Sequence, residues 1–317
     1  MSTSQQDYLY RVFFKLKLHE SSGDGFQALF SRLMAYAKPG FQAVSPWGNW
    51  GDGGNDGWVE SELHYYQVFG PKPNSNIKEF EVVRKAVEDF DKLIEKWGSV
   101  QKYSFVMNDR FQGIPAPVGA ALLKLKQDKS LLHSAAMGGD ELMRLFMGLV
   151  DDQRQDIVGY IPPEAPDFID SRAVGELLSF LAEKSVSNLD FLNEDAPDFD
   201  VKIDFNGLSK RVGVRLESNS YQVFLIDDFL ESIGEDYKQS ISKEVRDIYE
   251  ESKLVIPDSI ESFSDMRYFW MVDSLIPPEV KSHPQQMSGF RMAAEIVLAK
   301  YFETCDAYEN PDNVIAS

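Results

Sequence analysis

The sequence predicts a mixed α/β domain over residues 1–160 and a mostly α-helical domain over residues 161–317. The first prediction rests on a long amphipathic segment, residues 77–97, that lies between two short apolar segments, residues 65–69 and 103–107. A helix between two buried strands is typical of the crossover connection in a sheet with parallel strands. The second prediction rests on apolar residues that recur at helical spacing through most of the second half, in segments separated by prolines.

The first 44 residues predict three elements. Residues 8–18, YLYRVFFKLKL, are compatible with a strand or a short helix, and their aromatic and branched side chains favour the strand. Asp24 is a typical N-cap residue and predicts a helix that continues to about residue 36. Residues 41–44 predict a short strand.

A glycine-rich segment, residues 47–71, contains the clearest strand at its end. Its sequence is WGNWGDGGNDGWVESELHYYQVFGP, with six glycines around Asp52, Asn55 and Asp56. Glycine allows positive φ and a close approach of the backbone, so the cluster predicts a forced turn. Two interpretations stay open for the acids. They hold a metal ion, or they hold an Asx-type turn by accepting hydrogen bonds from following amides.

Further elements are predicted up to the domain boundary. Helices are expected over residues 115–127 and 140–149, and a short strand is expected over residues 156–160. Three prolines, Pro162, Pro163 and Pro166, then interrupt the chain and place the boundary near Tyr160.

The second half is predicted to be a helical bundle. Residues 201–205, VKIDF, are strand-like or extended. Helical patterns occupy residues 171–183, 222–232, 237–252, 259–275 and 285–307.

Composition and charge restrict the function. The net charge of −19 opposes unaided binding of a nucleic acid, because phosphate contacts need Lys and Arg; such binding would need a local basic patch or a basic partner. The single cysteine, Cys305, excludes an internal disulfide and a cysteine-cluster zinc site. The N-terminus lacks the pattern of a signal peptide, and no apolar run reaches the ~18 residues of a membrane span. We therefore expect a cytoplasmic protein that does not contact a membrane.

Other enzyme classes find little support in the motifs. The four histidines are scattered without metal-ligand spacing, and no Gly-Lys-Ser/Thr follows the glycine-rich turn as a Walker loop requires. An EF-hand is excluded because the twelfth residue from Asp52 is Leu63 instead of Glu. For Trp47, Trp50 and Trp58, packing in the core or the turn is favoured over stacking on bases.

The order of elements over residues 23–107 resembles the core of the PD-(D/E)xK nucleases, whose fold is restriction-endonuclease-like. In that family, carboxylates on two strands hold Mg²⁺, and a Lys two residues further along the third strand assists the attacking water. The resemblance implies that Asp56 and Gln67 would be the metal ligands. It places Phe69 where the Lys is expected, with Lys72 as a displaced substitute. For Gln67, a structural role as partner of a buried backbone group is the alternative.

A second resemblance covers most of the chain. Three N-terminal segments resemble the N-terminal module of bacterial conflict-system proteins: FQAVSPWGNWGDGGNDGW, YYQVFGP and KYSFVMNDRFQG. The later segments KIDFNGLSKRV and QVFLIDDF resemble the C-terminal helical domains of ABC three-component systems. This resemblance implies a role in anti-phage defence, an SMC/ABC-type ATPase as partner, and a small middle component. The acidic surface would then dock on a basic ATPase, with solubility as its plain alternative.

Two hypotheses follow. In the first, the chain is a defence-complex subunit whose nuclease-like module cleaves nucleic acid with Mg²⁺ when assembled with the ATPase. In the second, the nuclease-like fold is a catalytically inactive adaptor that recognises a partner or a nucleic-acid end. Phe69 separates the two, because a phenyl ring cannot polarise water.

Overall fold

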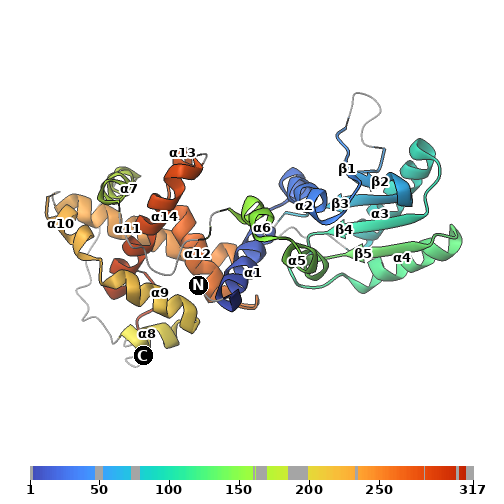
Figure 1. Ribbon diagram of the computed structural model, residues 1–317. Coiled ribbons are helices and arrows are strands. Elements are labelled where there is room, and N and C mark those ends of the chain that lie inside the picture. The colour runs from blue at the N-terminus through green and yellow to red at the C-terminus, as the bar shows by residue number, and fades with distance from the viewer. Residues whose placement is uncertain are drawn as a thin grey trace. The chain divides into compact units, whose positions relative to one another are not determined.

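A computed structural model describes residues 3–46, 53–72, 79–159, 161, 170–184, 199–232, 235–281, 283–304 and 307–311 (Figure 1). The chain divides into two compact units. The α/β unit is Phe13–Gly159, and the helical unit combines Met1–Val12 with Tyr160–Ser317. The predicted fold class, a mixed α/β part followed by a helical part, is confirmed.

The α/β unit is built on one mixed sheet with the strand order β1-β2-β3-β4-β5. β1 pairs antiparallel with β2 and β2 with β3, whereas β3, β4 and β5 are mutually parallel. Two parallel neighbours must be joined by a crossover, and the amphipathic segment between β3 and β4 supplies a helix for it. The strands are β1 (Phe41–Ala43), β2 (Gly57–Val59), β3 (His64–Phe69), β4 (Lys102–Met107) and β5 (His133–Met137).

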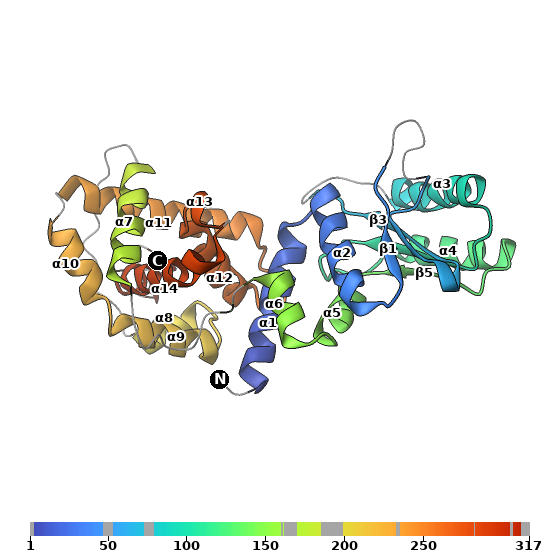
Figure 2. The ribbon, with the colours of Figure 1, turned by 45° about the horizontal axis from the view of Figure 1, so that its top comes forward.

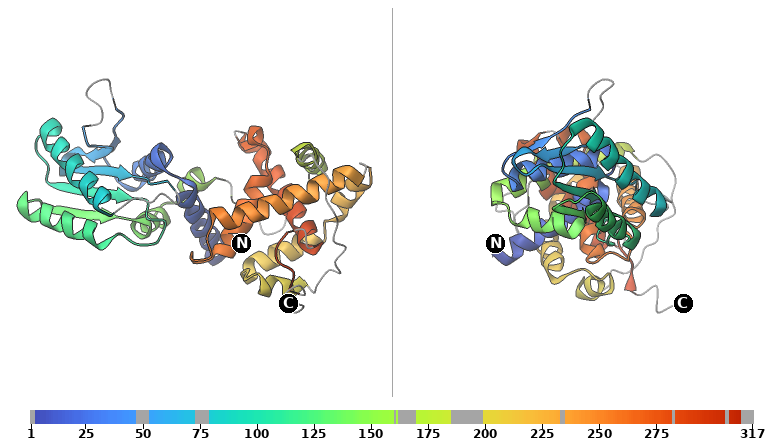
Figure 3. Two further views of the ribbon diagram at one scale, coloured as in Figure 1. Left: turned by 180° about the vertical axis from the view of Figure 1, so that it is seen from behind. Right: turned by 90° about the vertical axis from the view of Figure 1, so that its right-hand side faces the viewer.

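Helices cover both faces of the sheet. α3 (Glu79–Trp97) and α4 (Ala116–Asp128) lie side by side on one face, as Figure 3 shows from behind. Their apolar sides enclose a core with Tyr65, Tyr103 and Phe105 of the strands. α2 (Gly23–Ala37) packs on the opposite face, because its Phe30 contacts Tyr66, whose side chain alternates with that of Tyr65.

Three further helices complete this part of the chain. α5 (Gly139–Met147) packs against β5 and α2, and α6 (Asp151–Val158) packs against α2. α1 (Thr3–Glu20) belongs to the helical unit up to Val12 and to the α/β unit from Phe13.

The strand predicted over residues 8–18 is wrong, because this segment is part of α1. Its aromatic and branched side chains favour a strand locally, but a buried helix accommodates them equally well, and tertiary packing overrides so weak a preference. The polar residues Asp7, Arg11 and Lys15 recur every four residues, which is the helical signal that the apolar content conceals.

Two other predicted strands are also wrong. Residues 156–160 mostly belong to α6, whose first turn carries Asp151 and Asp152 at the positive end of the helix dipole. Residues 201–205 lie in α8 (Phe199–Phe205), where Val201 and Phe205 are exposed one turn apart. In both cases a five-residue window is too short to separate the two periodicities.

The helical unit packs around its last long helix, α14 (Pro284–Glu303), whose central residues are fully buried (Figure 2). α7, α9 and α12 are its main neighbours. The prediction missed α9 and α13 altogether. Besides α8, the described part of the unit contains α7 (Ser171–Lys184), α9 (Lys210–Ser220), α10 (Phe224–Ser232), α11 (Glu235–Val255), α12 (Phe263–Leu275) and α13 (Pro278–Lys281).

Paired charges occupy the interior of the helical unit. Arg215 of α9 donates to Glu295 of α14 at 2.8 Å, and Asn219 donates to the same carboxylate at 3.1 Å. Both members of the pair are almost fully buried, with side-chain exposures of 3% and 4%. Removing one partner would leave a buried charge uncompensated, so this pair joins α9 to α14 in one arrangement.

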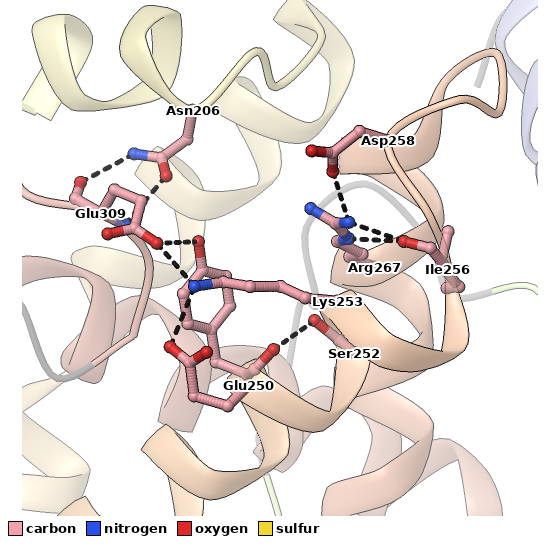
Figure 4. Close-up of polar contacts among 9 residues, drawn as sticks. Asn206, Glu250, Ser252, Lys253, Ile256, Asp258, Arg267 and Glu309 are labelled. Atoms are coloured by element: carbon pink, nitrogen blue, oxygen red, sulfur yellow. Dashed lines mark hydrogen bonds and ion pairs between the residues drawn. The ribbon is translucent and has the colours of Figure 1, made fainter.

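A surface-side network ties the chain segment after α14 to α11 (Figure 4). Glu309 accepts hydrogen bonds from Lys253 at 2.6 Å and from the Tyr249 hydroxyl at 3.3 Å. Asn206, just after α8, accepts from the Glu309 amide at 2.9 Å. Nearby, Arg267 of α12 donates to the Ile256 carbonyl and to Asp258.

Charge is divided unequally between the units. Residues 13–159 hold 17 Lys and Arg against 19 Asp and Glu, a net charge of −2. The remainder of the chain holds 15 against 32, a net charge of −17. The helical unit therefore carries nearly all of the acidic excess. In the described residues, no helix has the length and apolar character that crossing a bilayer requires.

Candidate functional site

The glycine-rich turn before β2 is seated on α3. Gly53 and Gly54 have positive φ values of 64° and 76°. A Cβ atom at Gly54 would lie only 2.2 Å from the carbonyl oxygen of Asp89 in α3. Only glycine fits there, both for its conformation and for its proximity to the helix. The turn is thus forced, as the glycine content predicts.

Asp56 connects the turn to two strands. Its amide donates to the Tyr66 carbonyl at 2.9 Å, and its carbonyl accepts from the Val44 amide at 3.0 Å. Its carboxylate, in a residue only 4% exposed, accepts a 2.6 Å hydrogen bond from the Val68 amide. A charge-assisted bond of this kind is strong and holds β2 in register with β3.

Asn55 makes the Asx-type turn. Its Oδ1 atom accepts from the Gly57 amide at 3.0 Å, the bond pattern from residue i to residue i+2. Asp56 was the predicted residue for such a turn, and its carboxylate instead bonds across to β3. Asp52, the other acid of that prediction, lies outside the described residues.

Gln67 lies in β3, where the register Gly57↔Tyr66 continues to place it opposite Asp56. It is 4% exposed, and its Oε1 atom has no hydrogen-bond partner among the described residues. The adjacent Asn55 Nδ2 atom is likewise without a partner in that part of the chain. A buried amide oxygen without a partner costs free energy, so the site has unused capacity to bind a water, an ion or a polar group.

Two further residues complete this buried polar group, here called the turn cluster and consisting of Asn55, Asp56, Gln67, Asp89 and Tyr103. The Tyr103 hydroxyl donates to the Ala86 carbonyl at 3.1 Å. Burial, with the nearby carboxylates of Asp89 and Asp56, raises the pKa of Tyr103 well above its ordinary value. The Asp89 carboxylate forms ion pairs with Lys85 Nζ at 2.8 Å and with Lys92 Nζ at 3.2 Å.

The three predicted site residues are not brought together. Asp56 and Gln67 are buried neighbours, but Lys72 is exposed beyond the end of β3. Phe69 packs into the core on the α3/α4 face and stacks on Phe105 with ring centroids 6.0 Å apart. No group of three or more His, Cys, Asp or Glu side chains in the described residues is arranged to hold a metal ion. Asp56 and Gln67 together have three side-chain oxygens of the kind that binds Mg²⁺, and one carboxylate oxygen of Asp56 already accepts from the Val68 amide.

A second polar group, which sequence reasoning missed, lies on the opposite face of the sheet. His64 Nε2 is 2.9 Å from Ser104 Oγ, and His64 Nδ1 is 3.0 Å from the Tyr66 hydroxyl. The His133 ring lies 5.7 Å from the His64 ring. We call this group the histidine cluster: Glu62, His64, Tyr66, Ser104 and His133. Its members come from three separate segments of the chain, and they meet because β3, β4 and β5 are parallel and begin at the same end of the sheet.

The histidine cluster is neutral in its centre and charged at its rim. Burial, followed by the neighbouring His133, lowers the pKa of His64 to about 4. Glu62 lies at the rim between Lys38 at 2.5 Å and Lys102 at 2.7 Å. Hydrogen bonds from these two lysines lower the pKa of Glu62 to about 2. At neutral pH the cluster therefore holds an uncharged imidazole beside a satisfied ion pair.

Other candidate residues have structural roles. Trp58 stacks on Tyr65 with centroids 5.6 Å apart and contacts Trp97, which supports its predicted packing role. Asp109, in the loop after β4, accepts from the amides of Phe111 and Gly139 at 3.1 and 2.8 Å. Trp47, Trp50 and Cys305 lie outside the described residues.

Replacing Gly54 should destabilise the α/β unit through the contact with α3. For Gly54→Ala we expect a loss at least about 2 kcal/mol larger than for Gly98→Ala, because overpacking adds to the strain of positive φ. Gly98 is the matched control, since its φ is 80° and a Cβ there meets nothing within 4 Å. Denaturant unfolding followed by tryptophan fluorescence reports this unit, which contains four of the five tryptophans. Equal losses in the two variants would contradict the seating of the turn on α3.

The histidine cluster should make stability depend on pH. An unfolded histidine titrates near pH 6.5, whereas folded His64 has a pKa of about 4. Between these values the unfolded chain binds a proton that the folded chain does not, so stability is full above about pH 6.5 and falls as the pH decreases towards 4. His19, whose pKa burial also lowers to about 4, acts in the same direction. In His64→Gln the loss between pH 7 and pH 4.5 should shrink by about 1–3 kcal/mol. The free energy of unfolding is measured at both pH values, and His283→Gln, at an exposed position, is the control.

The comparisons with known proteins bear on the helical unit. Residues 172–309 match the family described as C-terminal domain 10 of the ABC-three component (ABC-3C) systems. This range runs from α7 to the Glu309 network, so the similarity to ABC-3C systems lies in the helical unit. The search of curated proteins and the search of solved structures returned no match.

Proposed function

We propose that this chain is a subunit of an ABC-three component defence complex in prokaryotes. In this proposal the helical unit binds a partner component, and the α/β unit is a non-catalytic recognition module. The observation that carries it is the family match over residues 172–309, which spans most of the helical unit. The proposed partners are an SMC/ABC-type ATPase and a small middle component.

The division of charge supports the role of the helical unit. A net charge of −17 on this part of the chain produces a field that attracts a basic surface and raises the association rate. The α/β unit, at −2, lacks such a field. An ATPase with a basic docking surface would therefore be captured by the helical unit.

The packing of Phe69 supports a non-catalytic α/β unit. Water activation at this point of a nuclease-like sheet needs a cationic side chain, and Phe69 fills the position with a ring stacked on Phe105. Asp56, at the position of the metal-binding acid, accepts a hydrogen bond from the Val68 amide and so links β2 to β3. Both side chains thus have structural tasks in the fold.

A Mg²⁺-dependent nuclease is the second candidate, favoured by one observation. The Gln67 Oε1 atom is buried beside Asp56 without a partner among the described residues, as an unused metal ligand would be. Asp56 and Gln67 would hold the ion, and Lys72 would have to approach from beyond β3 to assist the chemistry. Bound Mg²⁺ would stabilise charge on a phosphodiester in the transition state.

Charge reversal at matched positions tests the docking role. With the ATPase and the middle component co-purified, Glu217→Lys/Glu231→Lys on the helical unit should weaken association about tenfold, mainly through the on-rate and more at low salt. Glu81→Lys/Glu95→Lys on α3 changes the net charge equally and should leave association nearly unchanged. All four residues are exposed. No association, or equal weakening in both variants, would overturn the docking role; biolayer interferometry at two salt concentrations measures it.

A cleavage assay separates the two candidates. The assembled complex, supplied with Mg²⁺ or Mn²⁺ and ATP, should leave single- and double-stranded DNA and RNA intact. Asp56→Asn is the informative variant, because an amide oxygen still accepts from the Val68 amide while the charge is lost. Cleavage by the wild-type complex that Asp56→Asn abolishes would establish the nuclease in place of the recognition module.

A further inference from the structure

The edge of the sheet formed by β5 is open. β5 pairs with β4 along one side, and no strand in the described part of the chain pairs with its other side. Edge strands in monomeric proteins are normally protected by a charged side chain, a proline or a bulge. β5 has the sequence HSAAM and has none of these, and Ala135, Ala136 and Met137 are only partly buried.

Two exposed leucines border this edge. Leu132, immediately before β5, is 65% exposed, and Leu123 of α4 is 56% exposed. α4 packs against β5, and the charge of Lys126 reaches His133 at the start of β5. Leu123 lies one turn before Lys126 on the same side of α4, so it shares this side of the helix. An apolar border next to unpaired backbone is the composition of a strand-pairing surface.

The two ends of β5 differ in charge. Lys126 supplies a positive charge near its start, and the exposed Asp140 follows its end in the first turn of α5. Two antiparallel copies of such a strand would place the basic end of each against the acidic end of the other. This edge is therefore complementary to itself, which is the requirement of a two-fold interface.

We propose that β5 pairs antiparallel with β5 of a second copy of this chain, which joins the two sheets into one. Ala135 would lie near the two-fold axis, Leu132 and Leu123 would be covered, and Lys126 would face Asp140 of the partner subunit. The extended strand of an unrelated protein would satisfy the same backbone groups. The opposite charges at the two ends favour the second copy. This inference does not depend on the proposed function.

Self-association of the full chain tests the proposal. Sedimentation velocity over a wide concentration range should show a monomer–dimer equilibrium. Leu132→Ser should weaken dimerisation at least about tenfold, as the loss of one buried leucine implies. The matched control is Leu254→Ser, since Leu254 of α11 is 76% exposed. It should leave the dimer unchanged.

A charge swap identifies the partner as a second copy. Lys126→Glu and Asp140→Lys should each weaken the dimer, and the double variant should restore it, because the pair is re-formed with reversed sign across the axis. Amide exchange of residues 133–137 should slow as the dimer forms, and circular dichroism checks that each variant is folded. A wild-type chain that stays monomeric would overturn the proposal, and so would a dimer that Leu132→Ser leaves intact or that the double variant fails to restore.

Discussion

The contact between the glycine-rich turn and α3 constrains the α/β unit more than any other. Gly54 approaches the Asp89 carbonyl so closely that no side chain fits between them. With the turn held there, Asp56 is aligned with Tyr66 and Val68, and β2 takes its register on β3. The carboxylates of Asp89 and Asp56 both lie near Tyr103. The contact of Gly54 with α3 therefore explains both why Asp56 is buried and why its carboxylate forms a structural hydrogen bond with the Val68 amide.

The two faces of the sheet carry polar groups of different kinds. The turn cluster lies on the α3/α4 face, where carboxylates are buried and one amide oxygen is without a partner among the described residues. The histidine cluster lies on the other face, where burial keeps His64 neutral and two lysines bind Glu62 at the rim. The first contains a buried amide oxygen that could accept a hydrogen bond from a ligand. Phe69 follows Gln67 on the same face of β3, and its ring stacks on Phe105.

The helical unit differs from the α/β unit in how its charges are distributed. It carries a net charge of −17. Its interior nevertheless contains a buried ion pair, Arg215 with Glu295. Buried pairs specify one packing of the helices, and the acidic excess that remains acts on partners in solution. The match to C-terminal domain 10 of the ABC-3C systems falls on this acidic unit.

Sequence alone determined the elements whose signal is local. The long helix α3 and the strands β3 and β4 were predictable, since nineteen residues of amphipathic periodicity and two apolar runs each specify one structure. The glycine-rich turn was predictable for the same reason. β5, with small side chains and no clear alternation, was not, and α1 was misjudged because packing overrode its local preference. Only the tertiary structure decided which side chains meet. Asp56 bonds to Val68, twelve residues away, and His64, Ser104 and His133 converge because parallel strands start at one edge.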